Sequence, residues 1–311
     1  MTFPIYYDSI YTDGLDPEAR FPRDRYRLVK AGIDSSRRAR NIEFRQPATI
    51  DLARVYRVHC RAYVNRFLRG ALSDQEARRI GLRPWTDSIV ERTLALTGGT
   101  VEATCHALVH GGAAANLGGG THHAHREFGS GYCIFNDLAI AAEVARVEYR
   151  VSRILILDLD VHQGDGTATI FSDEPNICTV SVHCGKNFPF RKAASDHDVE
   201  LEEGAGDSQY LEVLDDLLET VAKPFQPGLI LFQAGVDTLQ TDRLGHLAMT
   251  REGLQKRNRR VFSWAKEAGI PLLVTMGGGY GEPIQTSVQA HMDLFLGAAA
   301  TIESSEREPD L

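Results

Sequence analysis

The chain has 311 residues, of which 43% are hydrophobic and 24% are charged, and its formal net charge is −8. This length can bury a large core, and the acidic balance argues against a protein that binds nucleic-acid phosphates, because no basic face is implied. Five scattered cysteines without a CxxC pair argue against a disulfide scaffold, and no run of ~18 apolar residues predicts a membrane span.

The first hundred residues give the weaker structural signals. Segment 1–14 has neither a basic n-region nor a long apolar run, so we expect no signal peptide and a cytoplasmic protein. Residues 1–50 are rich in Pro, Arg, Tyr and Asp, which predicts surface segment and loop. In 90–112 the pair Gly98 and Gly99 interrupts an apolar pattern, which predicts two helices joined at the glycines.

Farther along the chain, apolar strands alternate with helical patterns. We expect helices at 135–150, 207–222 and 250–269, and strands at 153–160, 177–183, 229–235 and 271–280. Thr250 is a plausible N-cap and Gly269 a stop for the last helix. The alternation predicts an α/β fold, with one domain over 1–311 and a central parallel sheet flanked by helices on both faces. The basic clusters at 36–40 and 256–260 are interpreted as a solvated loop and a solvated helix face.

Chemically reactive side chains follow four of these strands. In strand order they are Asp158, Asp160 and His162, then His183 and Cys184, then Asp237, and last Tyr280. Ligands of a parallel α/β sheet bind outside the carboxyl ends of its strands. The sequence therefore predicts a functional site on one rim of the sheet.

The stretch "ILILDLDVHQGDGT" (154–167) begins as a buried strand and then places Asp158, Asp160 and His162 at alternate positions. On a strand these side chains would share one face, each ~7 Å from the next. A carboxylate and an imidazole from this stretch, joined by Asp237, would make an Asp/His/Asp metal site, and three protein ligands with a fourth position for water are typical of catalytic zinc. A buried ion-pair cluster is disfavoured, because buried carboxylates repel each other without a cation.

The stretch "GGGTHHAHREFGSGYC" (118–133) begins with three glycines, which imply that the backbone packs close to another group. It also contains two adjacent histidines, His122 and His123. In a turn, both rings can approach one pocket, and histidine suits proton transfer near neutral pH. On this segment alone, a surface histidine run or adventitious metal binding is an equal alternative.

Four motifs occur in a fixed order: "GGTHHAHREFGSGYCIFND", "ILILDLDVHQGDGT", "QAGVDT" and "GGGY". Together they resemble the motif set of the zinc-dependent histone deacetylase and acetoin-utilisation superfamily. The segments 20–29, 90–103 and 242–250 resemble in particular its class IV branch and bacterial relatives. The resemblance implies an arginase/deacetylase-like fold with its active site at the carboxyl ends of the strands.

The resemblance also implies roles for the matching residues. It implies one zinc ion per chain, with the ligands Asp160, His162 and Asp237. It implies catalytic roles for His122, His123, Asp158, Asp165 and Tyr280. The tandem histidines would handle protons, the two aspartates would fix their tautomers, and the tyrosine would hydrogen-bond the substrate carbonyl.

The same resemblance implies a tunnel for an acylated lysine of a protein or peptide. Its substrate-binding residues would be Gly131, Tyr132, Phe188, Phe190, Leu244 and Gly278, with either phenylalanine as the second wall. A structural potassium ion beside the zinc is implied at Asp158, Asp160, His162, Ser181 and Val182. Tyr132 replaces the familiar phenylalanine and Gln163 replaces a frequent second histidine, but neither change removes a catalytic group.

The implied activity is hydrolysis of acyl-lysine, releasing acetyl or longer fatty acyl groups. His123 would take the proton from a metal-bound water, and His122 would be its orienting or electrostatic partner. Zinc and Tyr280 would stabilise the oxyanion. No residue sets the tunnel depth, so the acyl length stays open, as does the oligomeric state.

Three rival functions use related chemistry or a related fold. An arginase-type hydrolase needs two metals about 3.5 Å apart, and "AGVDTLQTD" offers no Asp-x-Asp pair at Asp237. A deacetylase of small molecules, either acetylpolyamine or acetoin-linked, is an alternative. Leu244 stands where polyamine deacetylases carry an acidic residue, which argues against a cationic substrate tail. A non-catalytic acyl-lysine binding module would lack a ligand, a histidine or Tyr280, and all are present.

Overall fold

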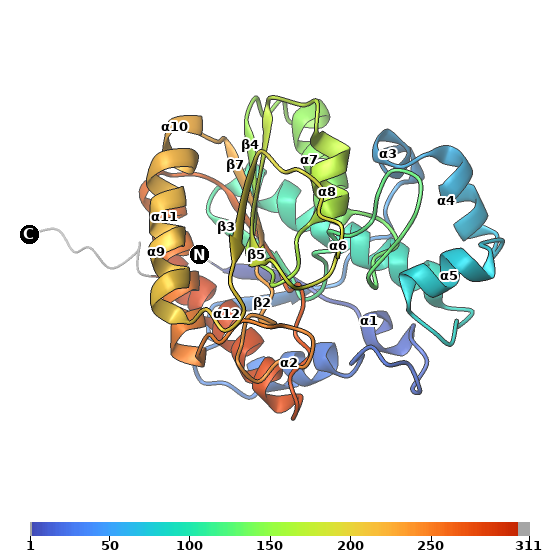
Figure 1. Cartoon of the computed structure of the whole chain (residues 1–311), viewed down its shortest axis with the longest axis horizontal. Helices are drawn as coiled ribbons and strands as arrows, with labels where there is room; N and C mark the ends of the chain where they lie inside the picture. The colour runs from blue at the N-terminus through green and yellow to red at the C-terminus, as the bar shows by residue number, and fades with distance from the viewer. Residues whose placement is uncertain (1, 304–311) are drawn as a thin grey trace, which may run out of the picture.

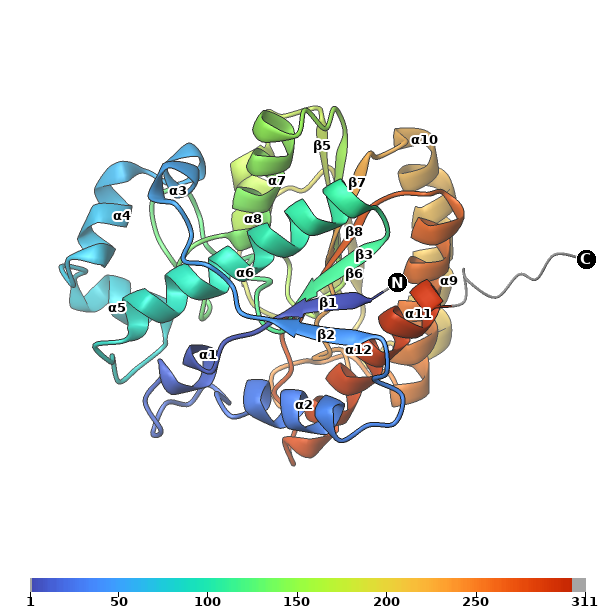
Figure 2. The ribbon, with the colours of Figure 1, turned by 180° about the vertical axis from the view of Figure 1, so that it is seen from behind.

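A computed structural model describes residues 2–303 and contains one eight-stranded sheet (Figures 1 and 2). In spatial order its strands are β2 (Ile42–Arg45), β1 (Phe3–Tyr6), β3 (Ala113–Asn116), β8 (Leu272–Thr275), β7 (Leu229–Gln233), β4 (Ile154–Asp158), β5 (Ile177–Cys184) and β6 (His197–Leu201). All neighbouring strands are parallel. The predicted α/β class is confirmed. That 1–311 forms one domain stays a prediction, and residues 304–311 lie outside the described range.

Helices cover both faces of the sheet, so its central strands are buried on both sides. One face carries α6 (Ile89–His110), α7 (Asp137–Glu148) and α8 (Asp165–Phe171), and the other carries α2 (Arg25–Asp34), α9 (Asp207–Leu217), α11 (Arg251–Glu267) and α12 (Gln285–Glu303). The remaining helical segments are α1 (Ile10–Asp13), α3 (Leu52–Val58), α4 (Arg61–Leu68), α5 (Asp74–Ile80), η1 (Leu218–Ala222) and α10 (Lys223–Phe225). The group α3–α5 lies beside α7, at the right of Figure 1.

The predicted helix at 250–269 is α11, and its start follows from a cap. The Thr250 hydroxyl accepts a hydrogen bond from the amide of Gly253 at 3.0 Å, which satisfies a donor of the first turn. Gly269 follows the helix with φ +65°, a conformation that favours glycine. None of the helices in the described range is long and apolar enough to span a membrane.

The predicted break at Gly98 and Gly99 is wrong, because α6 runs through both residues. A Cβ on Gly98 would meet the carbonyl oxygen of Ala48, and one on Gly99 would meet the Tyr11 hydroxyl and Asn116 Oδ1. The glycines therefore mark a helix face that backbone approaches closely at Gly98 and buried side chains approach closely at Gly99, not a joint between two helices.

The prediction of surface loop for residues 1–50 is also wrong. Phe3 and Ile5 are fully buried, and β1 lies inside the sheet between β2 and β3. Both N-terminal strands are only four residues long, so they leave little periodic signal in a segment rich in turn-forming residues.

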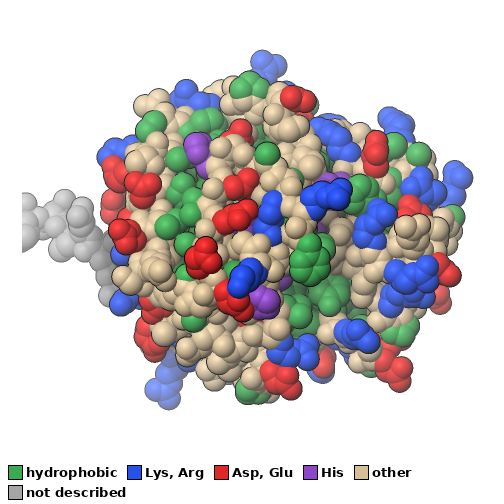
Figure 3. All heavy atoms as spheres, in the orientation of Figure 1, with side chains coloured by type: hydrophobic (Ala, Val, Ile, Leu, Met, Phe, Trp, Pro, Cys, Tyr) green, Lys and Arg blue, Asp and Glu red, His purple; other side chains and the backbone are tan. Residues whose placement is uncertain are grey.

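One of the two basic clusters is exposed as predicted, and the other is partly buried. Arg37, Arg38 and Arg40 are exposed, as a solvated loop requires, and acidic and basic side chains are interspersed over the face shown in Figure 3. The predicted solvated helix face is wrong for Arg257 and Asn258, which are buried. Asn258 accepts hydrogen bonds from Arg257, and Arg257 also donates to carbonyl oxygens in the loops of the functional site.

Candidate metal centre and active site

The loop after β4 differs from the predicted strand. β4 ends at Asp158, so Asp160 and His162 lie beyond the strand and do not continue its face. The amide of Asp160 donates to Asp158 Oδ1 at 3.2 Å, and the amide of His162 donates to Asp160 Oδ1 at 3.1 Å. These side-chain-to-backbone bonds curl the chain, because aspartate readily accepts from an amide two residues on. The expected ~7 Å spacing along one strand face is therefore wrong for Asp160 and His162.

The curl brings together, at the carboxyl ends of β4 and β7, three side chains that could bind a metal ion. Ligand atoms of Asp160, His162 and Asp237 all lie within 4.8 Å of one another. His162 Nδ1 is 3.0 Å from Asp160 Oδ1 and 3.2 Å from Asp237 Oδ2. A tetrahedral site with bonds of ~2.0 Å separates its ligand atoms by about 3.3 Å. The spacing of this group therefore fits a metal ion.

The charge of this group also favours a cation. All three residues are buried, and burial together with the charge of Asp160 raises the pKa of Asp237 to about 7. Backbone amides orient the carboxylates: Gly278 donates to Asp160 Oδ2 at 2.8 Å, and Val161 donates to Asp237 Oδ1 at 2.9 Å. A Cβ on Gly278 would collide with the Asp237 carboxylate, so glycine is required there. Although Gly278 lines the cavity, its amide is committed to Asp160.

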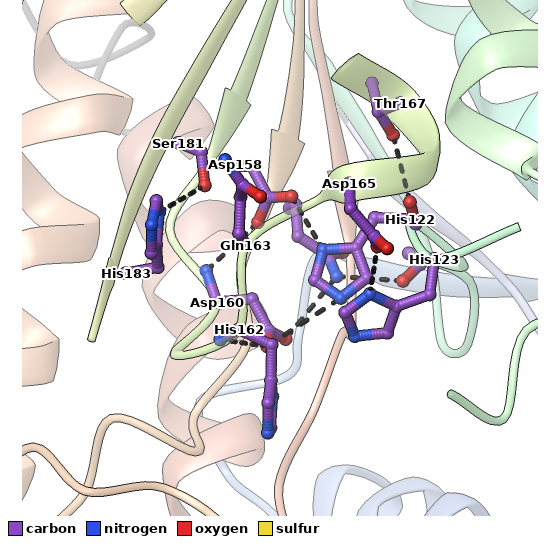
Figure 4. Close-up of polar contacts among 12 residues, drawn as sticks. His122, His123, Asp158, Asp160, His162, Gln163, Asp165, Thr167, Ser181 and His183 are labelled. Atoms are coloured by element: carbon purple, nitrogen blue, oxygen red, sulfur yellow. Dashed lines mark hydrogen bonds and ion pairs between the residues drawn. The ribbon is translucent and has the colours of Figure 1, made fainter. Parts of the chain in front are cut away.

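Each tandem histidine has its own carboxylate (Figure 4). His122 Nδ1 lies 2.7 Å from Asp158 Oδ2, and His123 Nδ1 lies 2.7 Å from Asp165 Oδ1. The two imidazole ring centres are 4.0 Å apart, and both side chains are buried. The predicted pairs of histidine and aspartate are thus present as hydrogen-bonded pairs, and each carboxylate fixes which ring nitrogen carries a proton.

Burial disfavours the charged form of both histidines, but their neighbours shift the two pKa values in opposite directions. For His122 the carboxylates of Asp158 and Asp160 outweigh burial and raise the pKa to about 9. For His123, burial and then the charge of His122 lower the pKa to about 4. At neutral pH the site therefore holds one charged and one neutral imidazole, the division of roles that acid–base catalysis needs.

A cavity of about 430 Å³ opens onto these residues. The Phe188 ring lies 4.9 Å from the His123 ring, and the Tyr132 ring lies 5.9 Å from that of Tyr280. Gly131 has φ +52°, and a Cβ there would come within 2.5 Å of His123 Cδ2. Phe188 and Tyr132 therefore both line the cavity close to the reactive side chains, whereas the role of Phe188 as the second wall stays a prediction.

The other two predicted contact residues lie at the mouth of the cavity. The Phe190 side chain is 92% exposed and that of Leu244 is 36% exposed. Both are apolar and exposed, and the lining of the cavity also includes the exposed cations Lys186 and Arg79.

Tyr280 lies at the end of the segment that follows β8. Its amide donates to Asp242 Oδ2 at 2.6 Å, and its ring centre is 6.5 Å from the His162 ring centre. Burial raises the pKa of the Tyr280 hydroxyl well above its usual value. The hydroxyl therefore stays protonated near neutral pH and can donate a hydrogen bond into the cavity.

The residues predicted to bind potassium cluster at the ends of β4 and β5. Asp158 pairs with Ser181 across the two strands, and all five residues are buried. Ser181 Oγ lies 2.9 Å from His183 Nδ1 (Figure 4).

Two supporting residues were missed by the sequence analysis. Arg257 of α11 donates to the carbonyl oxygens of Leu159 at 3.1 Å and Gly235 at 2.7 Å, and so ties together the loops that carry Asp160 and Asp237. No sequence signal marks it, because these partners are main-chain oxygens, its side-chain partner is the adjacent Asn258, and its other near neighbours in the sequence are basic.

The second missed residue is Asp137, at the start of α7. Its carboxylate accepts from the amides of Gly120 at 2.9 Å and Thr121 at 2.7 Å. It therefore fixes the turn that presents His122 and His123. The acidic residue at the end of the motif "CIFND" was the only available signal.

Comparison with known proteins adds to this geometry. A family model described as the histone deacetylase domain matches residues 19–295. An uncharacterized protein of Picosynechococcus sp. is 44% identical over 291 residues, which cover 94% of this chain and 96% of that protein. Histone deacetylase 8 of Xenopus laevis is 29% identical over 259 residues, covering 76% of this chain and 78% of that protein. The acetoin utilization protein of Bacillus subtilis is 32% identical over 232 residues, which cover 68% of this chain and 59% of that protein.

The family match spans the whole functional site, from the helix that precedes β2 to α12. It confirms the family suggested by the ordered motifs, and a deacetylase activity is what this family supports. The finer likeness to class IV stays a prediction. The chain belongs to the histone deacetylase family, in the superfamily that includes the acetoin utilization proteins.

Proposed function

We propose that this chain is a zinc-dependent amidohydrolase that removes acyl groups from lysine side chains of proteins. The observation that carries the proposal is a pair of adjacent histidines, His122 and His123, each hydrogen-bonded to its own carboxylate, beside the Asp160/His162/Asp237 group. One nitrogen and two oxygen ligands with an open position suit catalytic zinc, at one ion per chain. When bound there, zinc would polarise the acyl carbonyl and lower the pKa of a bound water.

The histidines divide the proton transfers. Asp165 accepts the Nδ1 proton of His123, which leaves Nε2 of the neutral ring free to take a proton from the attacking water. The positive charge of His122 faces the oxyanion that forms when the water adds to the acyl carbon. A histidinium then protonates the leaving amine as the C–N bond breaks, giving free lysine and a carboxylate.

Tyr280 completes the polar side of the site. Its protonated hydroxyl is the donor for the oxyanion, and the hydrogen bond from its amide to Asp242 holds the backbone that carries it. We also propose a structural potassium ion at Asp158, Asp160, His162, Ser181 and Val182, which would brace the loop after β4.

The form of the entrance supports an acyl-lysine rather than a polyamine substrate. Phe188 and Tyr132 form apolar walls around the path of an aliphatic side chain, and Leu244 offers no charge to a cationic tail. Asp242 lies two residues away, but Oδ1 accepts from the amides of Leu244 and Gly245 and Oδ2 from that of Tyr280. Its charge is thus committed to the backbone.

The test compares turnover of matched acyl-lysine peptides, from acetyl to myristoyl, with turnover of acetylated polyamines. Asp160→Ala, which lacks one metal ligand, is the control for contaminating activity. We expect turnover of acyl-lysine that is lost in the control. Turnover of polyamines alone would overturn the substrate assignment, and a metal-loaded protein inactive on the whole panel would favour a binding module.

A further inference from the structure

The mouth of the cavity presents exposed positive charge. Arg79 and Lys186 both line the cavity and are exposed. His246 lines it as well, with 46% of its side chain exposed. Among the described residues that line the cavity, the one carboxylate is that of Asp160, which is 1% exposed and belongs to the proposed metal site. A peptide that lies across the mouth would therefore meet cations and no exposed lining carboxylate.

Helix α5 places Arg79 on the Tyr132 side of the mouth. The carbonyl oxygen of Arg79 accepts from the amide of Gly131 at 3.2 Å, and that of Ile80 accepts from the amide of Tyr132 at 2.7 Å. The Arg79 guanidinium lies 4.5 Å from the centre of the Phe128 ring, so cation–π attraction orients it. Its N–H groups have no carboxylate partner among residues 2–303, so they are available to a ligand.

The positive charge on this side extends beyond Arg79. Segment 52–83, which contains α3, α4 and α5, has eight arginines and two carboxylates, although the whole chain has a net charge of −8. Three of these arginines pair with Glu148 or Glu76, whereas the other five, Arg79 among them, have no carboxylate partner in the described part of the chain. Basic side chains gather over α4 and α5, at the right of Figure 3. This side of the mouth therefore attracts an acidic peptide and repels a basic one.

Lys186 lies on the Phe188 side of the mouth, two residues before that ring. Its Nζ is 3.0 Å from Glu203 Oε2, but the two side chains are 68% and 52% exposed. An exposed ion pair of this kind is weak, so Lys186 can exchange Glu203, which does not line the cavity, for another carboxylate. On the remaining side, the segment 16–24 around Phe21 has charges of both signs, and none of them lines the cavity.

We propose that the mouth selects an acylated lysine whose neighbours in the substrate are acidic, with Arg79 and Lys186 as the specificity-determining contacts. The inference rests on the proposed function, which places the acylated lysine side chain in the cavity. An extended peptide advances ~3.3 Å per residue, so the two residues on each side of that lysine stay within about 7 Å of it and lie over the rim. Guanidinium and ammonium groups bind carboxylates through charge-assisted hydrogen bonds, whereas a tail rich in lysine and arginine would bring like charges together.

Three peptides test this preference. They share one acyl-lysine and carry acidic, uncharged or basic residues at the two positions on each side of it. We expect kcat/KM of the wild type to be roughly tenfold higher for the acidic than for the basic peptide, through KM rather than kcat, because the flanking residues do not touch the reacting atoms. The ratio should shrink as the ionic strength rises from about 0.05 M to about 0.5 M, since salt screens exposed charges.

Charge reversal shows which side chains are responsible. Arg79→Glu and Lys186→Glu should each lower the preference for the acidic peptide by about threefold, and the double variant should abolish or invert it. Arg69→Glu is the matched control, because Arg69 is exposed, has no carboxylate partner in the described range and does not line the cavity. The control should keep the peptide order of the wild type, since position at the mouth matters and net charge does not.

Binding of fluorescent versions of the same peptides to the zinc-loaded protein gives a readout that does not require turnover. If the wild type turns over none of the peptides, the proposed function fails, and the order of the binding constants still decides the charge preference. Equal or tighter binding of the basic peptide by the wild type would overturn the inference, as would the same peptide order in the wild type and the double variant. An acidic peptide with unmodified lysine that binds as tightly as its acylated counterpart would also overturn it, because the attraction would then not involve the cavity.

Discussion

Replacing Arg257 by methionine removes the side chain that ties together the loops carrying Asp160 and Asp237, the proposed metal ligands. The guanidinium is fully buried and donates to the carbonyl oxygens of Leu159, Ala234 and Gly235 at 2.7 to 3.2 Å. Methionine fills much of the same volume but donates nothing. The Leu159 carbonyl oxygen keeps the Tyr210 hydroxyl as a donor, whereas the carbonyl oxygens of Ala234 and Gly235 and the side-chain oxygen of Asn258 lose the donor that Arg257 supplies.

The size of the effect follows from these contacts. A buried acceptor left without a donor costs about 1–3 kcal/mol, and relief of the buried charge offsets part of that sum. Burial lowers the pKa of Arg257, which shows that the charge is indeed costly there. We therefore expect a net loss of about 3 kcal/mol, or about 8 °C in Tm at roughly 2–4 °C per kcal/mol for a chain of this size. Looser loops should also weaken zinc binding by about 10–100-fold.

The assay is thermal unfolding of the metal-free protein, together with zinc titration against a competing chelator. Lys256→Met is the matched control, because it removes the same charge from an exposed neighbour on α11. If Arg257→Met and Lys256→Met unfold within ~2 °C of each other and bind zinc equally, the bracing role assigned to Arg257 is refuted.

Three further predictions test other parts of the account. Gly98→Ala should destabilise the fold by about 2–3 kcal/mol in urea unfolding, because its Cβ meets the Ala48 carbonyl oxygen; a gain of ~1 kcal/mol, as helix propensity alone predicts, would contradict this. Tyr280→Phe should lower kcat by roughly 10²–10³ with little change in KM, since it removes an oxyanion donor; unchanged kcat would rule that role out. His59 has a pKa of about 4 when folded against 6.5 in the unfolded chain. The unfolded state therefore binds more protons between these values, and stability should fall by roughly 3 kcal/mol as pH drops from 6.5 to 4. In urea unfolding across that range, equal acid sensitivity of wild type and His59→Gln would count against this assignment.

The parts of the fold that the sequence predicted are those with a strong local pattern. The apolar strands β4, β5, β7 and β8 are buried on both faces, and the reactive residues follow their carboxyl ends, so the position of the site could be inferred. The four-residue strands β1 and β2 are too short for such a pattern.

The remaining errors have a common physical origin in contacts with backbone atoms. Gly98 and Gly99 serve close packing that only the folded chain creates. Arg257 binds carbonyl oxygens, which every residue carries and no sequence pattern reports. The curl from Asp158 to His162 depends on carboxylates accepting from nearby amides, a local choice that competes with strand extension.

The central claim is that one metal ion at Asp160, His162 and Asp237 serves the proton transfers of His123. The most direct measurement is turnover of an acetyl- or longer acyl-lysine peptide while zinc is titrated into the metal-free protein, with bound metal counted in parallel. Activity should rise linearly and reach its plateau at one zinc per chain, and Asp237→Asn should neither bind the ion tightly nor turn over. Full activity without metal, or a plateau only at two ions per chain, would contradict the account.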